Sequence, residues 1–456
     1  MWMGLLKKRL KCFFQKRGLY IVALSDDYKN FIEGLAPDKL DAMSTSTGEI
    51  AKKLNKNYYD LDGETSEHMY TVGSVGRKTS IKGVSDLDLL FDLPSDTYKK
   101  YDNYGENSNG QSALLQEVKK VLVERYPKTK MSGDGQVIVI EFTNYTVELV
   151  PGFKQSDGSF KYPDTHDGGS WKKTNPLPEI EESQSMSDST DSNFIYMCNM
   201  LRAWKNHIGF KFGGLLIDSL VYKFLNENEG YKNIGYDEYF NATKAIFEYL
   251  KGLNKDQAYW YALGSNQKVY NCDNGKFISK AKSAFEKISA YDGTEQEVNA
   301  KLQEIFGTIF PASEVVNESV YELAQRTEQF IGKLFPVDIQ YNLQIDCEVT
   351  QNGFREHKLR YMLINKLLLL RDKSLKFAIE NHDIPSDVYS QCDIYWKVKN
   401  VGSEAIRLKQ IRGQIEKTNS EVKYERTSFR GAHYVECYIV YNGVCIARDR
   451  IEVPIQ

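Results

Sequence analysis

The sequence predicts an α+β protein in which a mixed helix and strand region comes first, a mainly helical region second and a β-rich region last. Apolar residues recur at helical spacing in most segments before residue 333. Two short apolar runs, at about 86–91 and 137–150, are typical of strands. Beyond Phe335 and Pro336 the chain becomes alternating, aromatic and β-branched, which predicts strands there.

At roughly 150 residues per domain, a chain of 456 residues suggests two or three domains, and an apolar content of 41% is enough for their cores. We expect a basic N-terminal extension over residues 1–22 and an α+β core over 23–333. Within the core, the sheet is expected at about 55–178 and a mainly helical lobe at about 193–333. A separate, sandwich-like β-rich domain is expected over 335–456.

The elements of the core follow from local patterns. Helical spacing precedes the first strand, and Ser112 is placed to cap a helix in "NGQSALLQEVKKVLVERYP". The segment "GQVIVIEFTNYTVELVPGF" predicts two strands joined by a tight turn near Asn144. The acidic, serine-rich segment from Glu179 to Ser192 predicts a mobile loop. The expected order is therefore helix, strand, helix, hairpin, loop and helical lobe.

Charge and cysteine usage restrict the functional classes. The chain has 59 basic and 62 acidic side chains, whereas proteins that act on long nucleic acids usually have a basic excess, so small substrates are favoured. Seven cysteines without a CxxC pair give neither a zinc signature nor a disulfide framework, and we expect a reduced, cytoplasmic protein. No stretch reaches the ~20 apolar residues of a membrane span.

Two of the cysteines flank a predicted hairpin turn at Asn442 and Gly443. A two-residue turn at this position would pair Cys437 with Arg448 and Cys445 with Val440. The two sulfurs are then not expected to face each other.

Two aspartates, Asp86 and Asp88, interrupt the apolar run "SDLDLLF". Because side chains alternate along a strand with period two, both carboxylates lie on one face. A third acid, Glu148, interrupts a later apolar strand, and the three carboxylates converge if the two strands are neighbours. The open alternative is a set of solvated surface acids.

Clustered carboxylates in an apolar setting repel each other and lose hydration, so a cation is expected to compensate them. Oxygen ligands without nearby nitrogen or sulfur suit Mg²⁺ or Mn²⁺, which often shares its site with phosphate oxygens. Gly73 and Ser74 fit this picture, since a glycine allows close approach of a phosphate and backbone N–H groups with a hydroxyl bind its oxygens. The pattern therefore favours a nucleotide substrate.

These motifs carry a family resemblance. "GSVGRKTSIKGVSDLDLLF" with "YTVELVPGF" resembles the polymerase-beta-like nucleotidyltransferases, and within them the CD-NTases, the cGAS/DncV-like enzymes. "YPDTHDGGSWKKTNPLPEI" is similar to the segment after the third acid in their bacterial SMODS branch. In the C-terminal region, "YWKVKNVGSEA", "IRGQI" and "HYVECYIVYNGVCIARDRIEV" are similar to the AGS-C sensor domain.

The resemblance implies roles for particular residues. Gly73 and Ser74 would hold the triphosphate, while Asp86, Asp88 and Glu148 would bind the metal and form the catalytic set. The third acid is most often Asp in the superfamily, so Glu148 is one methylene longer than usual.

Further nucleotide contacts are implied by two other segments. "MLRAWKNH" is similar to a helix that supplies a triphosphate-binding Lys, but Arg202 stands at that position, and Lys205 lies three residues on. "LGSNQKVYNCD" resembles a loop that approaches a base, where Asn266 would bond a base edge and Tyr261 or Tyr270 would stack. The alternatives are a solvated basic helix face and structural roles, respectively.

The family resemblance also implies a function. Such enzymes use Mg²⁺ and nucleoside triphosphates to make cyclic di- or trinucleotides, which act on a downstream effector in the antiphage systems called CBASS. A nucleotidyltransferase acting on RNA ends or on a protein would use the same acids and is the first alternative. A catalytically silent, nucleotide-binding sensor module is the second.

Overall fold

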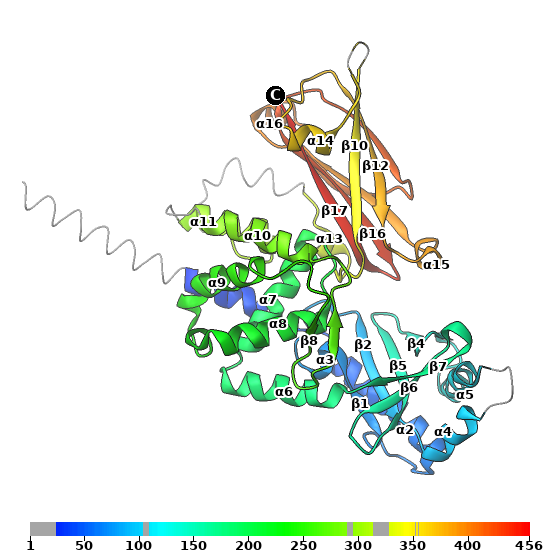
Figure 1. Ribbon diagram of the computed structural model, residues 1–456. Coiled ribbons are helices and arrows are strands. Elements are labelled where there is room, and N and C mark those ends of the chain that lie inside the picture. Colours follow the sequence, from blue (N-terminus) through cyan, green and yellow to red (C-terminus); the bar gives the residue numbers. More distant parts are fainter. Residues whose placement is uncertain (1–23, 104–108, 290–294, 313–327, 352, 354) are drawn as a thin grey trace, which may run out of the picture. The chain divides into compact units, whose positions relative to one another are not determined.

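The computed structural model describes residues 24–103, 109–289, 295–312, 328–351, 353 and 355–456 (Figure 1). The predicted extension over residues 1–22 lies outside them. The chain divides into two compact units, the first made of residues up to Arg202 together with Gly213–Ser289. The second combines Ala203–Phe212 with the chain from Ala290 to Gln456.

A seven-stranded sheet forms the centre of the first unit, with the order β1-β2-β5-β4-β3 and with β6 and β7 continuing from β5. Its strands are β1 (Met69–Thr71), β2 (Asp86–Asp92), β3 (Lys130–Asp134), β4 (Val137–Glu141), β5 (Thr146–Lys154), β6 (Phe160–Asp164) and β7 (Ser170–Thr174). β2 and β5 are parallel neighbours, whereas β4 and β5 form the predicted antiparallel hairpin, in which Glu141 pairs with Thr146. The predicted strand and hairpin are therefore confirmed.

Two long helices, α2 (Leu40–Tyr59) and α5 (Gly110–Arg125), cover one face of this sheet. Their apolar side chains share a core with the inward residues of β2, β4 and β5, among them Leu87, Leu89 and Phe91. The alternation predicted for β2 thus buries its leucines on the core side and leaves Asp86 and Asp88 on the other. N-capping of α5 comes from Asn109, whose side chain accepts from the Ser112 N–H, and not from Ser112 as predicted.

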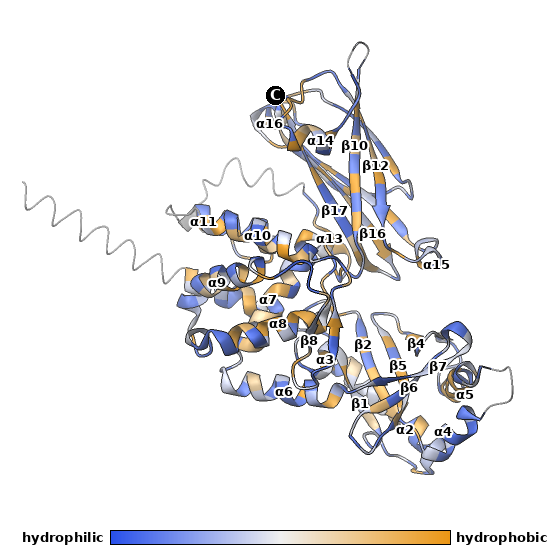
Figure 2. Ribbon diagram, in the orientation of Figure 1, coloured by the Kyte–Doolittle hydropathy of each residue, from blue (hydrophilic) through white to orange (hydrophobic). Residues whose placement is uncertain are grey.

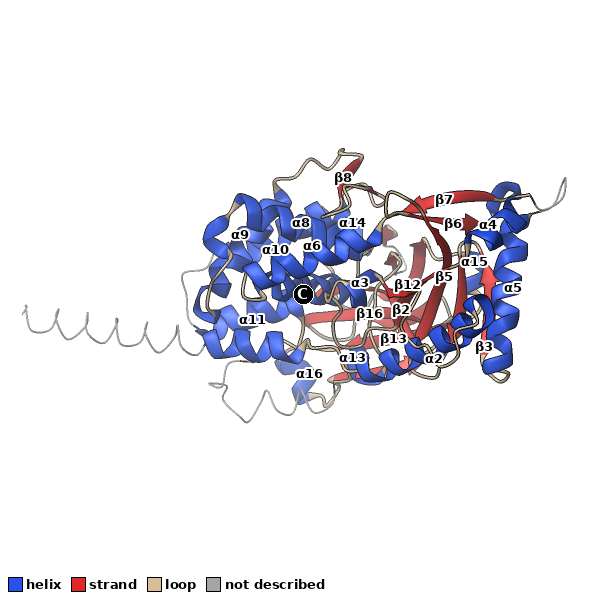
Figure 3. Ribbon diagram, turned by 90° about the horizontal axis from the view of Figure 1, so that it is seen from below, coloured by secondary structure: helices blue, strands red, loops and turns tan. Residues whose placement is uncertain are grey.

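The remaining helices of the first unit gather to one side of the sheet (Figure 3). They include α6 (Pro176–Ser189), the beginning of α7 (Asn193–Ile208), α8 (Gly214–Glu227), α9 (Tyr239–Lys251) and α10 (Lys276–Ser289). The short helices α3 (Gly73–Gly76) and α4 (Ser95–Asp102) and a two-stranded hairpin of β8 (Tyr259–Tyr261) and β9 (Lys268–Tyr270) complete the unit. This group forms the helical lobe that the spacing of apolar residues predicted.

The prediction of a mobile loop from Glu179 to Ser192 is wrong, because most of this segment forms α6. Proline at the start of the helix favours this position, and tertiary contacts then fix the polar sequence. Ser183 is fully buried and its hydroxyl donates to the Arg77 carbonyl at 2.7 Å. Buried polar contacts of this kind override a composition that is typical of a loop.

The second unit contains two four-stranded antiparallel sheets with the orders β11-β10-β12-β15 and β14-β13-β16-β17. The first sheet comprises β10 (Leu343–Thr350), β11 (His357–Lys358), β12 (Ser374–His382) and β15 (Val422–Arg426). The second comprises β13 (Asp393–Lys399), β14 (Arg412–Lys417), β16 (Gly431–Tyr441) and β17 (Val444–Ile455). Residues of both sheets share one core, and alternating hydropathy along their strands is visible in Figure 2. The predicted sandwich-like β-rich region is confirmed.

Among the described residues, α11 (Glu295–Phe306) is the longest helix that lies wholly within this unit. The others are α13 (Ile331–Leu334), α14 (Leu359–Ile364), α15 (Ser386–Tyr389) and α16 (Ser403–Arg407). In the described ranges no helix has the length and apolar character needed to cross a membrane.

The β16–β17 hairpin corrects one predicted register. Cys445 pairs with Val440 as expected, but Cys437 pairs with Asp449 and not with Arg448. The register shifts between Ile439 and Val440, and an extra residue in one strand moves every later pair by one position. The two cysteines are not opposite each other, and both are free and buried.

Candidate active site

The acids of β2 and β5 are brought together by strand pairing. Asp88 and Glu148 are direct partners in the parallel β2–β5 register, and Asp86 pairs with Thr146. All three carboxylate residues are partly buried. The condition stated from the sequence, that the two strands be neighbours, is therefore met.

The carboxylates influence each other electrostatically. Burial raises the pKa of Glu148, and the negative charge of Asp88 raises it further. Glu148 therefore binds a proton more readily than an exposed glutamate. A cation placed between the two groups would remove this penalty.

The Gly73–Ser74 turn lies directly against the acids. The Val72 N–H donates to the Asp88 carbonyl at 2.9 Å, and α3 begins at the next residue. Gly73 has a φ of 63°, and an added Cβ would overlap the Asp88 carboxylate, lying only 2.6 Å from its Cγ. Glycine is thus required both by backbone conformation and by the space that the carboxylate occupies.

The donor set fits Mg²⁺ or Mn²⁺ in kind, because all predicted ligands are carboxylates and hard cations prefer oxygen. In the described part of the chain, no group of three or more His, Cys, Asp or Glu side chains is placed to hold a metal ion. The structure therefore brings two acids, Asp88 and Glu148, into register, with Asp86 two residues away on the same strand face. The metal-ligand role of the three residues stays a prediction.

Two regions of the chain match known family models. Residues 22–186 match the model of the Second Messenger Oligonucleotide or Dinucleotide Synthetase domain, SMODS. Residues 325–456 match the Adenylyl/Guanylyl and SMODS C-terminal sensor domain, AGS_C. The two models together match more than half of the chain. The chain is a CD-NTase with a C-terminal AGS-C domain.

Individual relatives of this CD-NTase are distant. A probable cyclic nucleotide synthase of Bacillus cereus strain VD146 is 23% identical over 332 residues, covering 63% of this chain and 97% of that protein. A cyclic GMP-AMP synthase of Escherichia albertii is 30% identical over 110 residues, or 24% of each chain. The solved structure of E. coli MS115-1 CdnC with ATP is 17% identical, covers 63% of this chain and 98% of that one, and has a TM-score of 0.48. As a member of this family, the protein is a nucleotidyltransferase.

In this CD-NTase, Arg202 and Lys205, the two residues predicted to bind phosphate, form hydrogen bonds within the protein. The Arg202 guanidinium is almost fully buried and donates to both carboxylate oxygens of Asp218, at 2.6 and 3.0 Å. It also donates to the Gly214 carbonyl at 3.2 Å. Lys205 donates to Asp338 at 3.1 Å and to the Ile339 carbonyl at 2.8 Å. Triphosphate binding by either residue stays a prediction, and the contacts give both of them structural roles.

Asp218 is the centre of a buried ionic network that sequence reasoning missed. Besides Arg202, it accepts from Arg77 Nε at 2.9 Å and from the Thr79 hydroxyl at 2.8 Å. Arg77 follows α3 directly and also lies 3.6 Å from the Glu179 carboxylate. The signal was present in the sequence, because Asp218 interrupts the apolar run "GGLLIDSLVY" as Asp86 and Asp88 interrupt theirs.

Asn266 lies at the exposed turn of the β8–β9 hairpin with a φ of 54°. Tyr261 and Tyr270 on this hairpin are 59% and 62% exposed, so their rings are accessible for stacking. The turn is anchored to α6, because the Ser265 hydroxyl donates to Glu179 at 2.8 Å. The base-binding roles of these side chains stay predictions.

Proposed function

We propose that the protein is an Mg²⁺-dependent synthase that makes cyclic di- or trinucleotide second messengers from nucleoside triphosphates in CBASS antiphage defence. The observation that carries the proposal is the in-register pairing of Asp88 with Glu148, with Gly73 packed against Asp88. The SMODS and AGS_C matches support the product class through the descriptions of those domains. The product would then act on a downstream effector.

The residues divide the work as follows. Asp86, Asp88 and Glu148 would hold Mg²⁺ or Mn²⁺, which activates a ribose hydroxyl and neutralises the leaving pyrophosphate. Gly73 and Ser74 bind the triphosphate through backbone N–H groups and a hydroxyl. Glu148, whose pKa is raised by burial and by Asp88, accepts the proton of the attacking 3′- or 2′-hydroxyl.

A cyclic dinucleotide needs two transfers, and a cyclic trinucleotide repeats the first kind once more before the ring closes. In the first, the hydroxyl of one nucleotide attacks the α-phosphate of another and pyrophosphate leaves. In the last transfer, the linear intermediate is turned so that its free hydroxyl attacks the α-phosphate of its own 5′-triphosphate, a further pyrophosphate leaves, and the ring closes. Alignment of the reacting groups and electrostatic stabilisation supply most of the rate.

The test is to incubate the purified protein with labelled ATP, GTP, CTP and UTP and with Mg²⁺ or Mn²⁺, followed by phosphatase. Phosphatase-resistant small products are expected from the wild type and not from the Asp86→Ala/Asp88→Ala variant. Leaving out one nucleotide at a time identifies the bases. Label on added tRNA without small products would instead identify an RNA-end transferase, and no product under either condition would favour a silent sensor.

A matched control is available on the same strand. Asp92 lies on the same face of β2 as Asp86 and Asp88, but its carboxylate accepts a hydrogen bond from the Lys154 backbone N–H at 2.8 Å. Asp92→Asn keeps this acceptor, so its activity should match that of the wild type. Equal loss in Asp92→Asn would mean that any change of charge on β2 disables the protein.

A further inference from the structure

The second unit contains a cavity of about 680 Å³, which is within the size range of sites for small organic ligands. Its apolar wall comes from both sheets of the β-rich domain. The contributing side chains belong to the shared core and are Leu375, Phe377, Val398, Val435, Val453 and Ile455. An aromatic or other flat apolar body would replace water against this wall.

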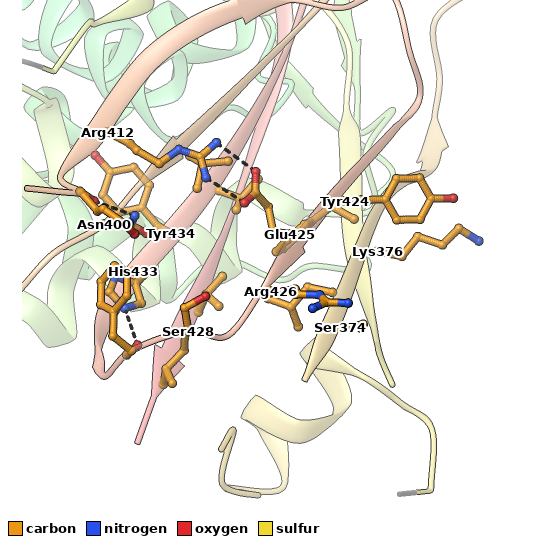
Figure 4. A pocket seen from close by; sticks show the side chains of 18 of the residues that line it. Ser374, Lys376, Asn400, Arg412, Tyr424, Glu425, Arg426, Ser428, His433 and Tyr434 are labelled. Atoms are coloured by element: carbon orange, nitrogen blue, oxygen red, sulfur yellow. Dashed lines mark hydrogen bonds and ion pairs between the residues drawn. The ribbon is translucent and has the colours of Figure 1, made fainter. Parts of the chain in front are cut away.

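The polar lining of the cavity includes an ion pair between the edge strands of the two sheets (Figure 4). The Arg412 guanidinium on β14 donates to both carboxylate oxygens of Glu425 on β15, at 2.7 and 2.9 Å. The side chains are 37% and 20% exposed, so the pair is reached by solvent, and the Glu416 carboxylate adds a weaker electrostatic contact to Arg412. It therefore offers hydrogen-bonding groups beside an apolar wall.

The backbone geometry around Arg412 directs its side chain toward Glu425 at the cavity. The register of β13 with β14 shifts between Lys397 and Lys399, and Arg412 itself has a φ of 55°. The following residue, Gly413, has a φ of 115° and packs against Glu328. A register shift re-aims a side chain, and a left-handed conformation in a residue other than glycine is retained only where the surroundings enforce it.

The charges on the apolar side of the cavity cancel. Arg412 and Glu425 neutralise each other, and His433 adds no charge, because burial lowers its pKa and its Nδ1 accepts the Val401 N–H. Lys376 and Tyr424 pair across β12 and β15 on the opposite face from Glu425, and Figure 4 shows both pointing away from the Arg412–Glu425 pair. The other charged lining residues share that opposite face, since Arg426 lies two residues from Tyr424 and Glu348 pairs with Lys376 across β10 and β12. On the face that carries Glu425, an anion thus finds the Arg412 charge already compensated.

An uncharged ligand with a donor and an acceptor on one edge fits this arrangement. The guanidinium has five N–H donors, of which the two bonds to Glu425 leave others available, and a carboxylate has more acceptor sites than these two bonds occupy. Such a ligand would bond both members of the pair without breaking it. Adjacent amide-like donor and acceptor groups on a flat apolar ring are the chemistry of a nucleobase.

We propose that the β-rich domain binds a nucleobase-like heterocycle in this cavity, with its hydrogen-bonding edge against Arg412 and Glu425 and its ring against the apolar wall. The site lies outside the nucleotidyltransferase acids and does not rest on the proposed function. It gives the domain, whose family is described as a sensor, a specific class of ligand.

The test is calorimetric titration of the full chain, in the presence of EDTA, with adenosine, guanosine, cytidine and uridine separately, and with benzoate as an anionic probe. At least one nucleoside should bind saturably with one site per chain. Glu425→Gln keeps the shape but removes the neutralising charge and one acceptor, so it should weaken nucleoside binding about tenfold or more. The same change should strengthen benzoate binding.

The control is an ion pair between the same two strands that does not line the cavity. Lys423 on β15 donates to Glu416 on β14 at 2.8 Å, so Glu416→Gln removes a comparable contact. Because Glu416 acts on Arg412 only through its charge, Glu416→Gln should change nucleoside affinity much less than Glu425→Gln. Asp86→Ala/Asp88→Ala, which separates this site from the catalytic one, should leave nucleoside affinity unchanged. No saturable nucleoside binding, equal loss in Glu416→Gln, or binding of benzoate alone would overturn the proposal.

Discussion

Two groups of carboxylates in the first unit, one partly and one fully buried, show opposite electrostatic arrangements. At the candidate active site, Asp88 and Glu148 are strand partners, and burial and the Asp88 charge raise the pKa of Glu148. In the ionic network of Asp218 with Arg77 and Arg202, Asp218 is fully buried. Burial alone would raise the pKa of Asp218, but Arg202 and Arg77 outweigh it and lower the pKa to about 2.

The difference in charge compensation distinguishes a structural carboxylate from a candidate functional one. Asp218 has cationic partners supplied by the chain itself, so its charge is compensated whether or not a ligand binds. The charge of Glu148 is disfavoured in the protein alone, and such unfavourable ionisation is common where a ligand or metal completes the site. An ionised carboxylate therefore stabilises the fold at Asp218 and lowers the stability of the protein at Glu148.

The largest effect is expected for Asp218→Asn. This change leaves Arg77 and Arg202 without their shared buried counter-charge, which should lower the free energy of unfolding by about 3–5 kcal/mol. Equilibrium urea unfolding measures it. Glu49→Gln, which breaks the exposed Glu49–Arg125 pair at 2.8 Å, is the control and should have little effect. An equally small effect of Asp218→Asn and Glu49→Gln would contradict the stabilising role of the Asp218 charge.

Glu148→Gln should have the opposite sign for stability. The variant removes a buried negative charge beside Asp88, so the thermal unfolding midpoint should rise. Nucleotidyl transfer should fall by about 100-fold or more, because the amide cannot accept the proton. Glu141→Gln on the neighbouring β4 is the control, and its activity should be unchanged. A loss of stability in Glu148→Gln would show that the Glu148 charge is compensated within the protein.

Gly73→Ala tests the contact between the turn and the acids. The new Cβ would overlap Asp88, and alanine is strained at a φ of 63°, so we expect a loss of about 1–2 kcal/mol together with weaker nucleotide binding. Thermal unfolding and a titration of nucleotide binding measure the two effects. Gly34 is a suitable control, since no atom lies within 4 Å of an added Cβ there. Equal behaviour of Gly73→Ala and Gly34→Ala would contradict the close packing.

Features with short-range patterns could be predicted from the sequence. The period-two alternation of β2 placed Asp86 and Asp88 on one face, and the turn near Asn144 placed Glu148 on the second strand of a hairpin. These predictions succeeded because strand periodicity and turn chemistry depend on neighbouring residues. The strands of the C-terminal domain were predicted for the same reason.

Features that depend on distant contacts could not be predicted. The Arg77 and Asp218 side chains are 141 positions apart in sequence, and no local pattern pairs them. The family resemblance assigned Arg202 to phosphate, and no local pattern revealed its contact with a carboxylate of the next helix. Helix α6 was mistaken for a loop because its polar residues, such as Ser183, are satisfied by tertiary hydrogen bonds that composition does not reveal.

The smallest effect is the pH dependence of stability, for which the two carboxylates should have opposite slopes. Because the folded pKa of Glu148 is raised, the folded protein binds its proton more tightly than the unfolded chain, and stability falls as the pH rises from about 4.5 through the raised pKa. Asp218 has a lowered pKa, so its contribution is present above about 3.8 and is lost as the pH falls toward about 2. Urea unfolding at stepped pH, compared between the wild type and Glu148→Gln, isolates the first slope. Parallel curves for the two proteins would mean that Glu148 titrates alike in the folded and unfolded states, and that the active-site acids carry no electrostatic penalty for a cation to relieve.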